Sequence, residues 1–264
     1  MYLYLYDSFL YTKNHSKVLD KIESRLTDLN LNGLSIVIDS SEKTPTLIEK
    51  ELNRGVTTVI IIGNDYTIKN VMRLVGSLNP NSLSINNVAF AIIPVGKTNN
   101  EIAESFGVLP EEKACDCLAQ RRLVNLDLGI INESIFFLTD IFFTTVTTLN
   151  LLIDDNYSID LSPKTSIRIV NLAITSNLKQ LKTSNINSSP DDGWLEIIIQ
   201  KNNKNTFSWL SKTPKVSVIK AKNIKIIEDI TYLQFDSNLI VKFPKKISVL
   251  KQRLNFIVGK DRVF

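Results

Sequence analysis

The chain has 264 residues, a formal net charge of +4, two cysteines and one histidine. Hydrophobic residues make up 44% and charged residues 22% of it, a globular composition with enough apolar side chains for one large or two modest domains. The charge is too small to indicate a nucleic-acid partner. Cys115 and Cys117 allow no disulfide scaffold, and a single histidine, His15, indicates neither a zinc site nor a Ser-His-Asp triad. We therefore expect a cytoplasmic protein with reduced thiols.

Strands and helices alternate over the first 122 residues. Short apolar runs predict strands over 1–6, 34–38, 57–62 and 88–93. Apolar residues at helical spacing and capping residues predict helices from Ser16, from Pro45 to about Arg54, from Thr67 to Leu78, after Thr98, and from Pro110. This alternation is typical of a doubly wound parallel sheet, and we predict an α/β domain over 1–122.

The pattern changes after about Leu123. Short β-type segments follow one another, separated by turns such as Asn132-Glu133 and Pro190-Asp191-Asp192-Gly193. The most apolar stretch, Ile135 to Ile153, contains Asp140 and many threonines, which favours buried strands over a membrane-spanning helix. We predict an antiparallel β domain over 123–264, whose last residues return to pack on the first domain.

Two loops of the first domain are candidates for a ligand site. Gly63 to Thr67 and Pro94 to Thr98 each follow a predicted parallel strand and precede a helix, and ligands of open α/β sheets bind beyond the carboxyl ends of the strands. Helix N-termini favour phosphate, and Gly63 would let the backbone approach it. Asp65 could hold Mg²⁺ or accept a hydroxyl proton, and Thr67 could cap the helix. A plain strand-to-helix turn is the alternative.

The sequence Gly96-Lys97-Thr98 does not complete a P-loop, because Ala91 stands where that motif needs its first glycine.

Several segments, in this order, resemble one family. Gly63-Asn64-Asp65-Tyr66-Thr67 is similar to the Gly-Gly-Asp-Gly-Thr loop of diacylglycerol kinase-type lipid kinases, sphingosine kinases and NAD kinases. The segment IIPVGKTNNEIAESFGV is similar to that family's Ile-Pro-Leu-Gly-Thr-Ala-Asn-Asp-Phe-Ala segment, with Lys97 as a one-residue insertion. RRLVNLDLGIINESIFFL resembles the link into the family's β domain, and SPDDGWLEIII resembles a strand start of the lipid-kinase branch.

The resemblance implies a fold and an activity. The fold would be an N-terminal doubly wound parallel sheet, acting as a nucleotide-binding kinase-type domain, followed by a C-terminal antiparallel β-sandwich. Such proteins bind ATP between the two domains and transfer its γ-phosphoryl group, with Mg²⁺, to a lipid hydroxyl. We therefore expect an ATP-dependent lipid kinase acting on a diacylglycerol-like lipid.

The resemblance also implies roles for individual residues. Asp65 would be the catalytic base or would anchor the Mg²⁺ network, in a solvent-facing loop with Tyr66 turned away from the ligand. The nucleotide would be bound by Gly63, Asn64, Asp65, Thr67, Gly96, Thr98 and Asn100. Metal ligands would be Asp192, with the carbonyls of Ser189 and Trp194 at a second, structural Mg²⁺ site, and Asp236. The two loops should lie side by side at the carboxyl edge of the sheet.

Departures from the family pattern leave alternatives open. Asn64 and Tyr66 replace two glycines, and Asn70 and Asn238 stand where the family has glutamates. An amide keeps an oxygen ligand but loses the charge that holds a divalent ion. A catalytically silent relative that binds a nucleotide or a lipid is therefore the first alternative, and a kinase of a soluble substrate is the second.

Partners follow from the same considerations. The predicted partners are a nucleotide and, transiently, a lipid or membrane surface, and the chain could form a homodimer. Ile135 to Phe143 could line an acyl-chain channel or fill the β core, and we favour the core. Basic residues gather late in the chain and would dock on anionic lipid if they shared one face: Lys242, Lys245, Lys246, Lys251, Arg253, Lys260 and Arg262.

Overall fold

The protein divides into two compact units. The computed structural model describes residues 1–12, 14–38, 43–78, 87–96, 98–174, 188–201, 216–228, 232–235, 239–242 and 244–264. One unit comprises Met1–Leu126 with Gln252–Phe264, and the other comprises Asp127–Lys251. Two strands, β5 (Leu123–Ile131) and β16 (Lys246–Ile257), run from one unit into the other.

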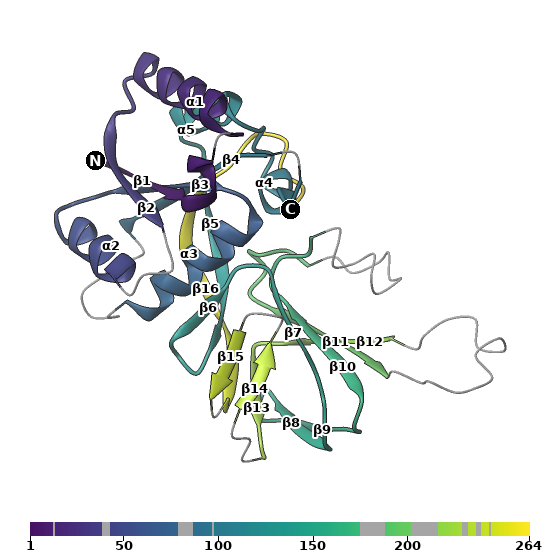
Figure 1. Ribbon diagram of the computed structural model, residues 1–264. Coiled ribbons are helices and arrows are strands. Elements are labelled where there is room, and N and C mark those ends of the chain that lie inside the picture. The colour runs from purple at the N-terminus through teal and green to yellow at the C-terminus, as the bar shows by residue number, and fades with distance from the viewer. Residues whose placement is uncertain are drawn as a thin grey trace. The chain divides into compact units, whose positions relative to one another are not determined.

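The first unit is built on a parallel sheet in the order β2-β1-β3-β4 (Figure 1). Its strands are β1 (Tyr2–Asp7), β2 (Gly33–Ile38), β3 (Thr58–Gly63) and β4 (Ala89–Pro94). The end of β16 also belongs here, because Asn255 pairs with Ala89 and Phe256 with Phe90, parallel to β4. The predicted doubly wound parallel sheet is confirmed.

Helices flank this sheet. They are the 3₁₀ turn η1 (Ser8–Tyr11), α1 (Ser16–Asp28), α2 (Lys43–Asn53), α3 (Asp65–Ser77), α4 (Glu101–Ser105) and α5 (Glu112–Gln120). Helix α1 contacts α5 and α2 contacts α3, and Figure 1 shows the two pairs on opposite sides of the strands. Every residue of β3 and β4 is buried as a result, which explains the continuous apolar runs in their sequences.

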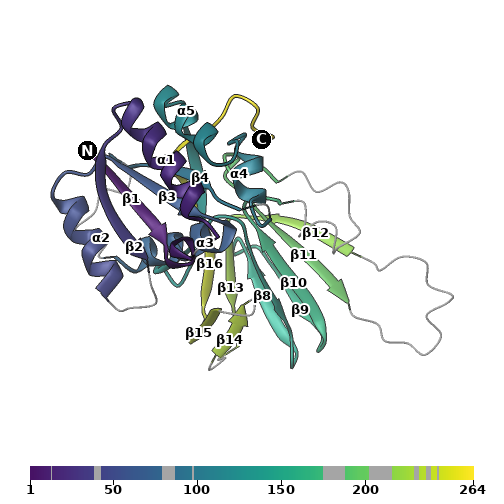
Figure 2. The same ribbon diagram turned by 45° about the horizontal axis from the view of Figure 1, so that its top comes forward.

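The second unit contains two antiparallel sheets (Figure 2). One has the order β12-β11-β10-β7, and the other joins β9, β8, β13 and the start of β16. The bounds are β6 (Ile135–Phe137), β7 (Asp140–Thr144), β8 (Leu149–Ile153), β9 (Tyr157–Leu161), β10 (Thr165–Val170), β11 (Leu195–Lys201), β12 (Val216–Ala221) and β13 (Asn223–Ile226). Strand β6 pairs with β5, and β14 (Tyr232–Phe235) pairs with β15 (Leu239–Lys242). The predicted antiparallel class of this half is confirmed.

Side chains from both sheets form one core in the second unit. Phe137, Ile141 and Phe143 from the apolar stretch lie in it, together with Ile169 of β10 and Ile197 of β11. Core packing is therefore the observed role of this stretch. Among the described residues, no helix is long and apolar enough to cross a membrane.

Truncating one side chain of this core should destabilise the second unit. Ile169 is fully buried between Ile141 and Ile197, so Ile169→Ala should cost about 2–5 kcal/mol of unfolding free energy. Val218, on β12, is 46% exposed, and Val218→Ala should cost about 0.5 kcal/mol or less. Urea unfolding followed by tryptophan fluorescence reports this unit, since both tryptophans, Trp194 and Trp209, fall within its sequence. Equal midpoints for the two variants would contradict the assignment of the core.

Candidate functional site

Three strand ends meet at one edge of the parallel sheet. Strand β1 ends at Asp7, β3 at Gly63 and β4 at Pro94, and Gly63 is paired with Pro94. Strand β1 lies between β2 and β3. The chain therefore passes from β1 to β2 on one side of β1 and then to β3 on its other side. Such a reversal of strand order is where open α/β sheets bind their ligands.

The two predicted loops lie side by side at this edge, as the sequence predicted. The N–H of Val95 donates to the carbonyl of Gly63 at 2.8 Å, and the N–H of Asp65 donates to the carbonyl of Asn99 at 2.7 Å. The loops therefore form one structure whose parts are more than 30 residues apart in sequence.

Asn64, rather than Thr67, caps the helix that follows the first loop. Its Oδ1 accepts hydrogen bonds from the N–H groups of Tyr66, at 3.0 Å, and Thr67, at 3.3 Å. The Thr67 hydroxyl accepts in turn from the N–H of Asn64 at 3.0 Å, which completes a capping box. The expected helix start at Thr67 was therefore wrong, because α3 already begins at Asp65.

Thr67 also ties the loop to the end of β1. Its Oγ1 donates to Oδ2 of Asp7 at 2.7 Å, and Oδ1 of Asp7 accepts from the N–H of Phe9 at 3.2 Å. A Cβ at Gly63 would overlap the Thr67 side chain. The glycine thus makes room for this threonine, whereas the sequence suggested that it makes room for a ligand.

Asp65 points into the protein. Its side chain is 8% exposed, Oδ2 accepts from the N–H of Glu101 at 2.9 Å, and Oδ1 accepts from the N–H of Ile102 at 3.1 Å. These N–H groups open α4, so the carboxylate caps that helix. The expectation of a solvent-facing Asp65 was wrong, because the second loop covers it.

Burial changes the acidity of this carboxyl group. Desolvation raises the pKa of Asp65 to about 6, although the hydrogen bonds from Ile102 and Glu101 and the charge of Lys69 act in the opposite direction. A carboxyl group with this pKa is ionised at neutral pH and remains a usable proton acceptor.

The second loop combines strained backbone with a buried amide. Gly96 has φ of +98°, a conformation that favours glycine, and its carbonyl accepts from Nδ2 of Asn100 at 2.7 Å. Asn100 is buried, and its Oδ1 accepts no hydrogen bond from the described residues. Thr98 is exposed, and Lys97 lies outside the described residues. Asn100 is therefore a buried acceptor that a ligand could use.

Every N–H group from Asn64 to Thr67 already has an acceptor within the protein. The acceptors are the Thr67 hydroxyl, the Asn99 carbonyl and, for the last two groups, the Asn64 side chain. The Tyr66 ring takes no part, since its side chain is 65% exposed. A phosphate group could reach the N–H groups of Tyr66 and Thr67 only if the Asn64 side chain moved.

Of the side chains predicted as metal ligands, the structure describes Asp192 but not Asp236. Asp192 lies in the second unit, where its Oδ1 accepts from the N–H of Trp194 at 3.0 Å and its Oδ2 from Nζ of Lys220 at 2.9 Å. Asp236 lies outside the described residues. No group of three or more His, Cys, Asp or Glu side chains in the described part could hold a metal ion. The ammonium of Lys220 already pairs with Asp192, so the neighbours of this side chain do not favour a Mg²⁺ ion, and Asp236 stays a prediction.

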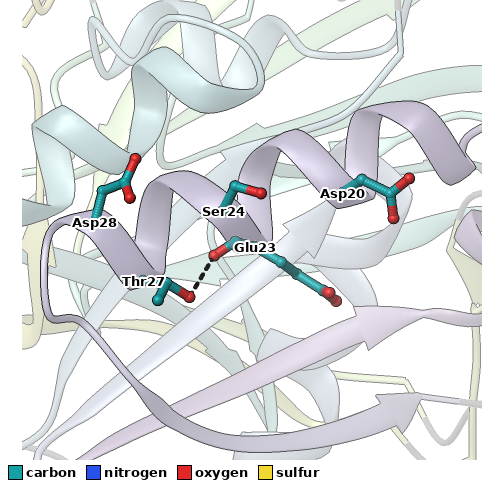
Figure 3. A pocket seen from close by; sticks show the side chains of 5 residues that line it. All are labelled: Asp20, Glu23, Ser24, Thr27 and Asp28. Atoms are coloured by element: carbon teal, nitrogen blue, oxygen red, sulfur yellow. Dashed lines mark hydrogen bonds between the residues drawn. The ribbon is translucent and has the colours of Figure 1, made fainter.

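A shallow hollow on α1 is separate from these loops. Asp20, Glu23, Ser24, Thr27 and Asp28 line it, and the Thr27 hydroxyl donates to the Glu23 carbonyl (Figure 3). None of the predicted site residues is among them. Carboxylates repel phosphate, so this hollow is not a candidate for the nucleotide.

Sequence reasoning missed two partners of the predicted residues, Asp7 and Lys220. Asp7 had a signal, since it is the polar residue directly after the first strand. Lys220 had none, because its carboxylate partner is 28 positions away.

Comparisons with known proteins agree with this architecture. Across 99% of its length the chain aligns with 98% of a solved structure described as a diacylglycerol kinase from Bacillus anthracis str. Sterne, with a TM-score of 0.74 and 17% identity. A second structure from that organism covers the same shares with a TM-score of 0.72 and 16% identity. At these identities the likeness is one of fold. No curated protein matches the sequence.

The chain thus consists of a parallel α/β unit and an antiparallel β unit, the fold of these solved structures. Residues 3–131 match the family model described as the diacylglycerol kinase catalytic domain. The resemblance seen in the sequence therefore has an independent match to the same family model over this segment.

The buried Asp65 should give the first unit a measurable pH dependence. Because the folded state raises the pKa of Asp65, the proton stabilises that state fully below about pH 4 and this contribution is lost as the pH rises through about 6. The Asp65→Asn variant has no carboxyl group at this position, so its stability does not fall with pH for this reason. The stability of the variant relative to the native chain should therefore rise between about pH 4 and about pH 7, by on the order of 3 kcal/mol.

Urea unfolding followed by the helical circular dichroism signal measures this difference, because the described helices belong to the first unit. Asp20→Asn, on the exposed surface of α1, is the matched control and should show no such trend. If the unfolding free energies of Asp65→Asn and the native chain changed in parallel between about pH 4 and about pH 7, the burial of the carboxyl group would be refuted.

Proposed function

We propose that this protein is an ATP-dependent phosphotransferase of the diacylglycerol kinase type, which transfers the γ-phosphoryl group to the hydroxyl of a diacylglycerol-like lipid. The observation that carries the proposal is the direct bonding of the two family-like loops, Gly63–Thr67 and Pro94–Asn100, at the point where strand order reverses. The family match over residues 3–131 supports the same reaction class.

The chain's own groups suggest how each loop would act. The N–H groups of Tyr66 and Thr67 would meet phosphate oxygens once the Asn64 side chain turns away, because they open α3 and carry its positive dipole end. The free Oδ1 of Asn100 would accept from an N–H or hydroxyl group of the nucleotide. Phosphoryl transfer requires mainly positioning and charge neutralisation, which suits such a set of donors.

Asp65 would accept the proton of the attacking hydroxyl once the second loop, which covers it, moves aside. Its raised pKa suits a general base near neutral pH, and its bonds to Glu101 and Ile102 hold the carboxylate in one orientation. A bound Mg²⁺ would supply charge neutralisation in this family. No three His, Cys, Asp or Glu side chains of the described residues could hold one metal ion together, so we assign no Mg²⁺ ligand.

A specific observation favours a second candidate function. The Asn64 side chain already occupies the N–H groups that a phosphate would need, and it stands where the family has a glycine. A catalytically silent relative that binds a nucleotide weakly, or only a lipid, would have this arrangement. The two candidates differ in whether Asn64 is displaced by ATP.

Replacing Asn64 by glycine separates these candidates. Asn64→Gly frees the N–H groups of Tyr66 and Thr67 and should cost only a few tenths of a kcal/mol of stability. If the loop binds phosphate, this variant should bind Mg²⁺-ATP more tightly than the native chain and should show the larger rise in melting temperature. A ligand at 100 times its Kd adds about 2.7 kcal/mol, which corresponds to several degrees in a protein of this size.

The matched control is Tyr66→Gly, which also introduces a glycine but keeps the Asn64 cap. Because the Tyr66 ring is exposed, this variant should show the native response to ATP. Phosphorylation of diacylglycerol in mixed micelles with labelled ATP, measured for all three proteins, tests turnover. No thermal response to Mg²⁺-ATP in any of them, together with no labelled lipid, would reject the kinase proposal in favour of the silent relative.

A further inference from the structure

A turn of the second unit brings two carboxylates next to one lysine. The turn precedes β11, and it carries Asp192 and the left-handed Gly193, with φ of +76°. Oδ2 of Asp192 lies 2.9 Å from Nζ of Lys220, and Oε1 of Glu196 lies 3.5 Å from the same nitrogen. Glu196 and Lys220 are directly opposite each other on strands β11 and β12. Figure 1 shows these two strands as neighbours.

Glu196 is a buried carboxylate that few groups of the protein stabilise. It is 2% exposed, and neither of its carboxylate oxygens accepts a hydrogen bond of ordinary geometry from the described residues. An isolated buried carboxylate is strongly destabilising, whereas one beside a positive charge is tolerated. The ammonium of Lys220, at ion-pair distance, supplies that charge.

The rest of the turn is fixed by backbone contacts. Asp127 is buried in β5, its Oδ2 accepts from the N–H of Gly193 at 2.6 Å, and its N–H donates to the Pro190 carbonyl at 2.6 Å. The aliphatic part of Lys251 packs over Gly193, where a Cβ would overlap it. The turn therefore holds Asp192 against Lys220 without any added ion.

We propose that the ammonium group of Lys220 takes the place of a divalent cation at this turn, so that the second unit is stable without metal and a cation site appears there only when the amine is removed. The family resemblance predicted Mg²⁺ at Asp192, and the structure places the ammonium of Lys220 beside this carboxylate. An ammonium between two carboxylates offsets one of their two negative charges, and it also repels a second cation from the same position.

The reason for the exchange is chemical. Mg²⁺ requires near-octahedral coordination by oxygen and gives up its water reluctantly, so it binds poorly where two carboxylates already share an amine. A lysine on a flexible four-carbon stem reaches both carboxylates and is present at full occupancy whatever the metal concentration. This inference does not depend on the proposed kinase activity, because it concerns the stability of the second unit.

Thermal unfolding of the full chain tests the proposal, in EDTA and in millimolar Mg²⁺, Ca²⁺ or Mn²⁺. Native chain should melt at the same temperature in all four conditions. Lys220→Met removes the charge and keeps the length of the side chain, and in EDTA it should melt about 2–6 °C lower, since the amine is half exposed. A divalent cation should restore most of this loss in the variant.

Two further variants make the result decisive. Lys225→Met removes a lysine of the same unit that pairs with Asp155 at the surface, so it should change the melting temperature little and show no cation response. Lys220→Met combined with Glu196→Gln leaves no uncompensated buried charge. This double variant should fold even if the single variant does not, and it should have lost the response to cations.

The proposal is overturned if the native chain is stabilised by divalent cations more than Lys220→Met is. It is also overturned if Lys220→Met and Lys225→Met have the same melting temperature and divalent cations change neither of them. Isothermal titration with Mn²⁺ gives an independent readout, because Lys220→Met should bind one more ion than the native chain.

Discussion

The buried carboxylate of Asp65 joins the two loops at the edge of the parallel sheet. Two hydrogen bonds from the start of α4 end on it, and its own N–H donates to the Asn99 carbonyl. Hydrogen bonds to a charged group contribute about 1.5–3 kcal/mol each, so this residue determines how far the loops can separate. The helix starts of α3 and α4 are both positioned by residues 64 and 65, and any ligand at this edge meets a surface that they define.

The same principle operates in both units. The chain's own side chains make the contacts at positions where the sequence resemblance predicted phosphate-binding donors or bound metal. Asn64 occupies the N–H groups of α3, Asp65 those of α4, and Lys220 stands beside Asp192 and Glu196. These intramolecular hydrogen bonds and ion pairs stabilise the folded chain without a ligand. A phosphate group at the first loop would have to displace the Asn64 side chain, and the free energy of breaking that cap would lower its binding affinity.

Much of the fold could be predicted from the sequence, because its signals are local. The continuous apolar runs over 57–62 and 88–93 are what a strand covered on both faces requires, and they became β3 and β4. The side-by-side placement of the loops followed from parallel strands sharing one edge. The resemblance to the family rested on short motifs in the correct order, and this too is information written along the chain.

The roles of the site residues depended on contacts between distant positions, which local patterns do not contain. Asn64 and Thr67 are both good capping residues, and only the backbone geometry shows that Asn64 is the cap. Asp65 was expected in solvent because loops usually are, but Glu101 and Ile102, 36 and 37 positions away, bury it. The bond between Asp7 and Thr67 spans 60 positions, and that between Asp192 and Lys220 spans 28.

The Asn64 side chain occupies the N–H groups of Tyr66 and Thr67, and under the proposed function ATP would have to displace it. Backbone amide resonances of Tyr66 and Thr67, followed by NMR during titration with Mg²⁺-ATP, test it most directly. We expect these two resonances and the side-chain amide of Asn64 to shift together, in proportion to the bound fraction. Shifts confined to other parts of the chain, with these three signals unchanged at saturation, would contradict the account.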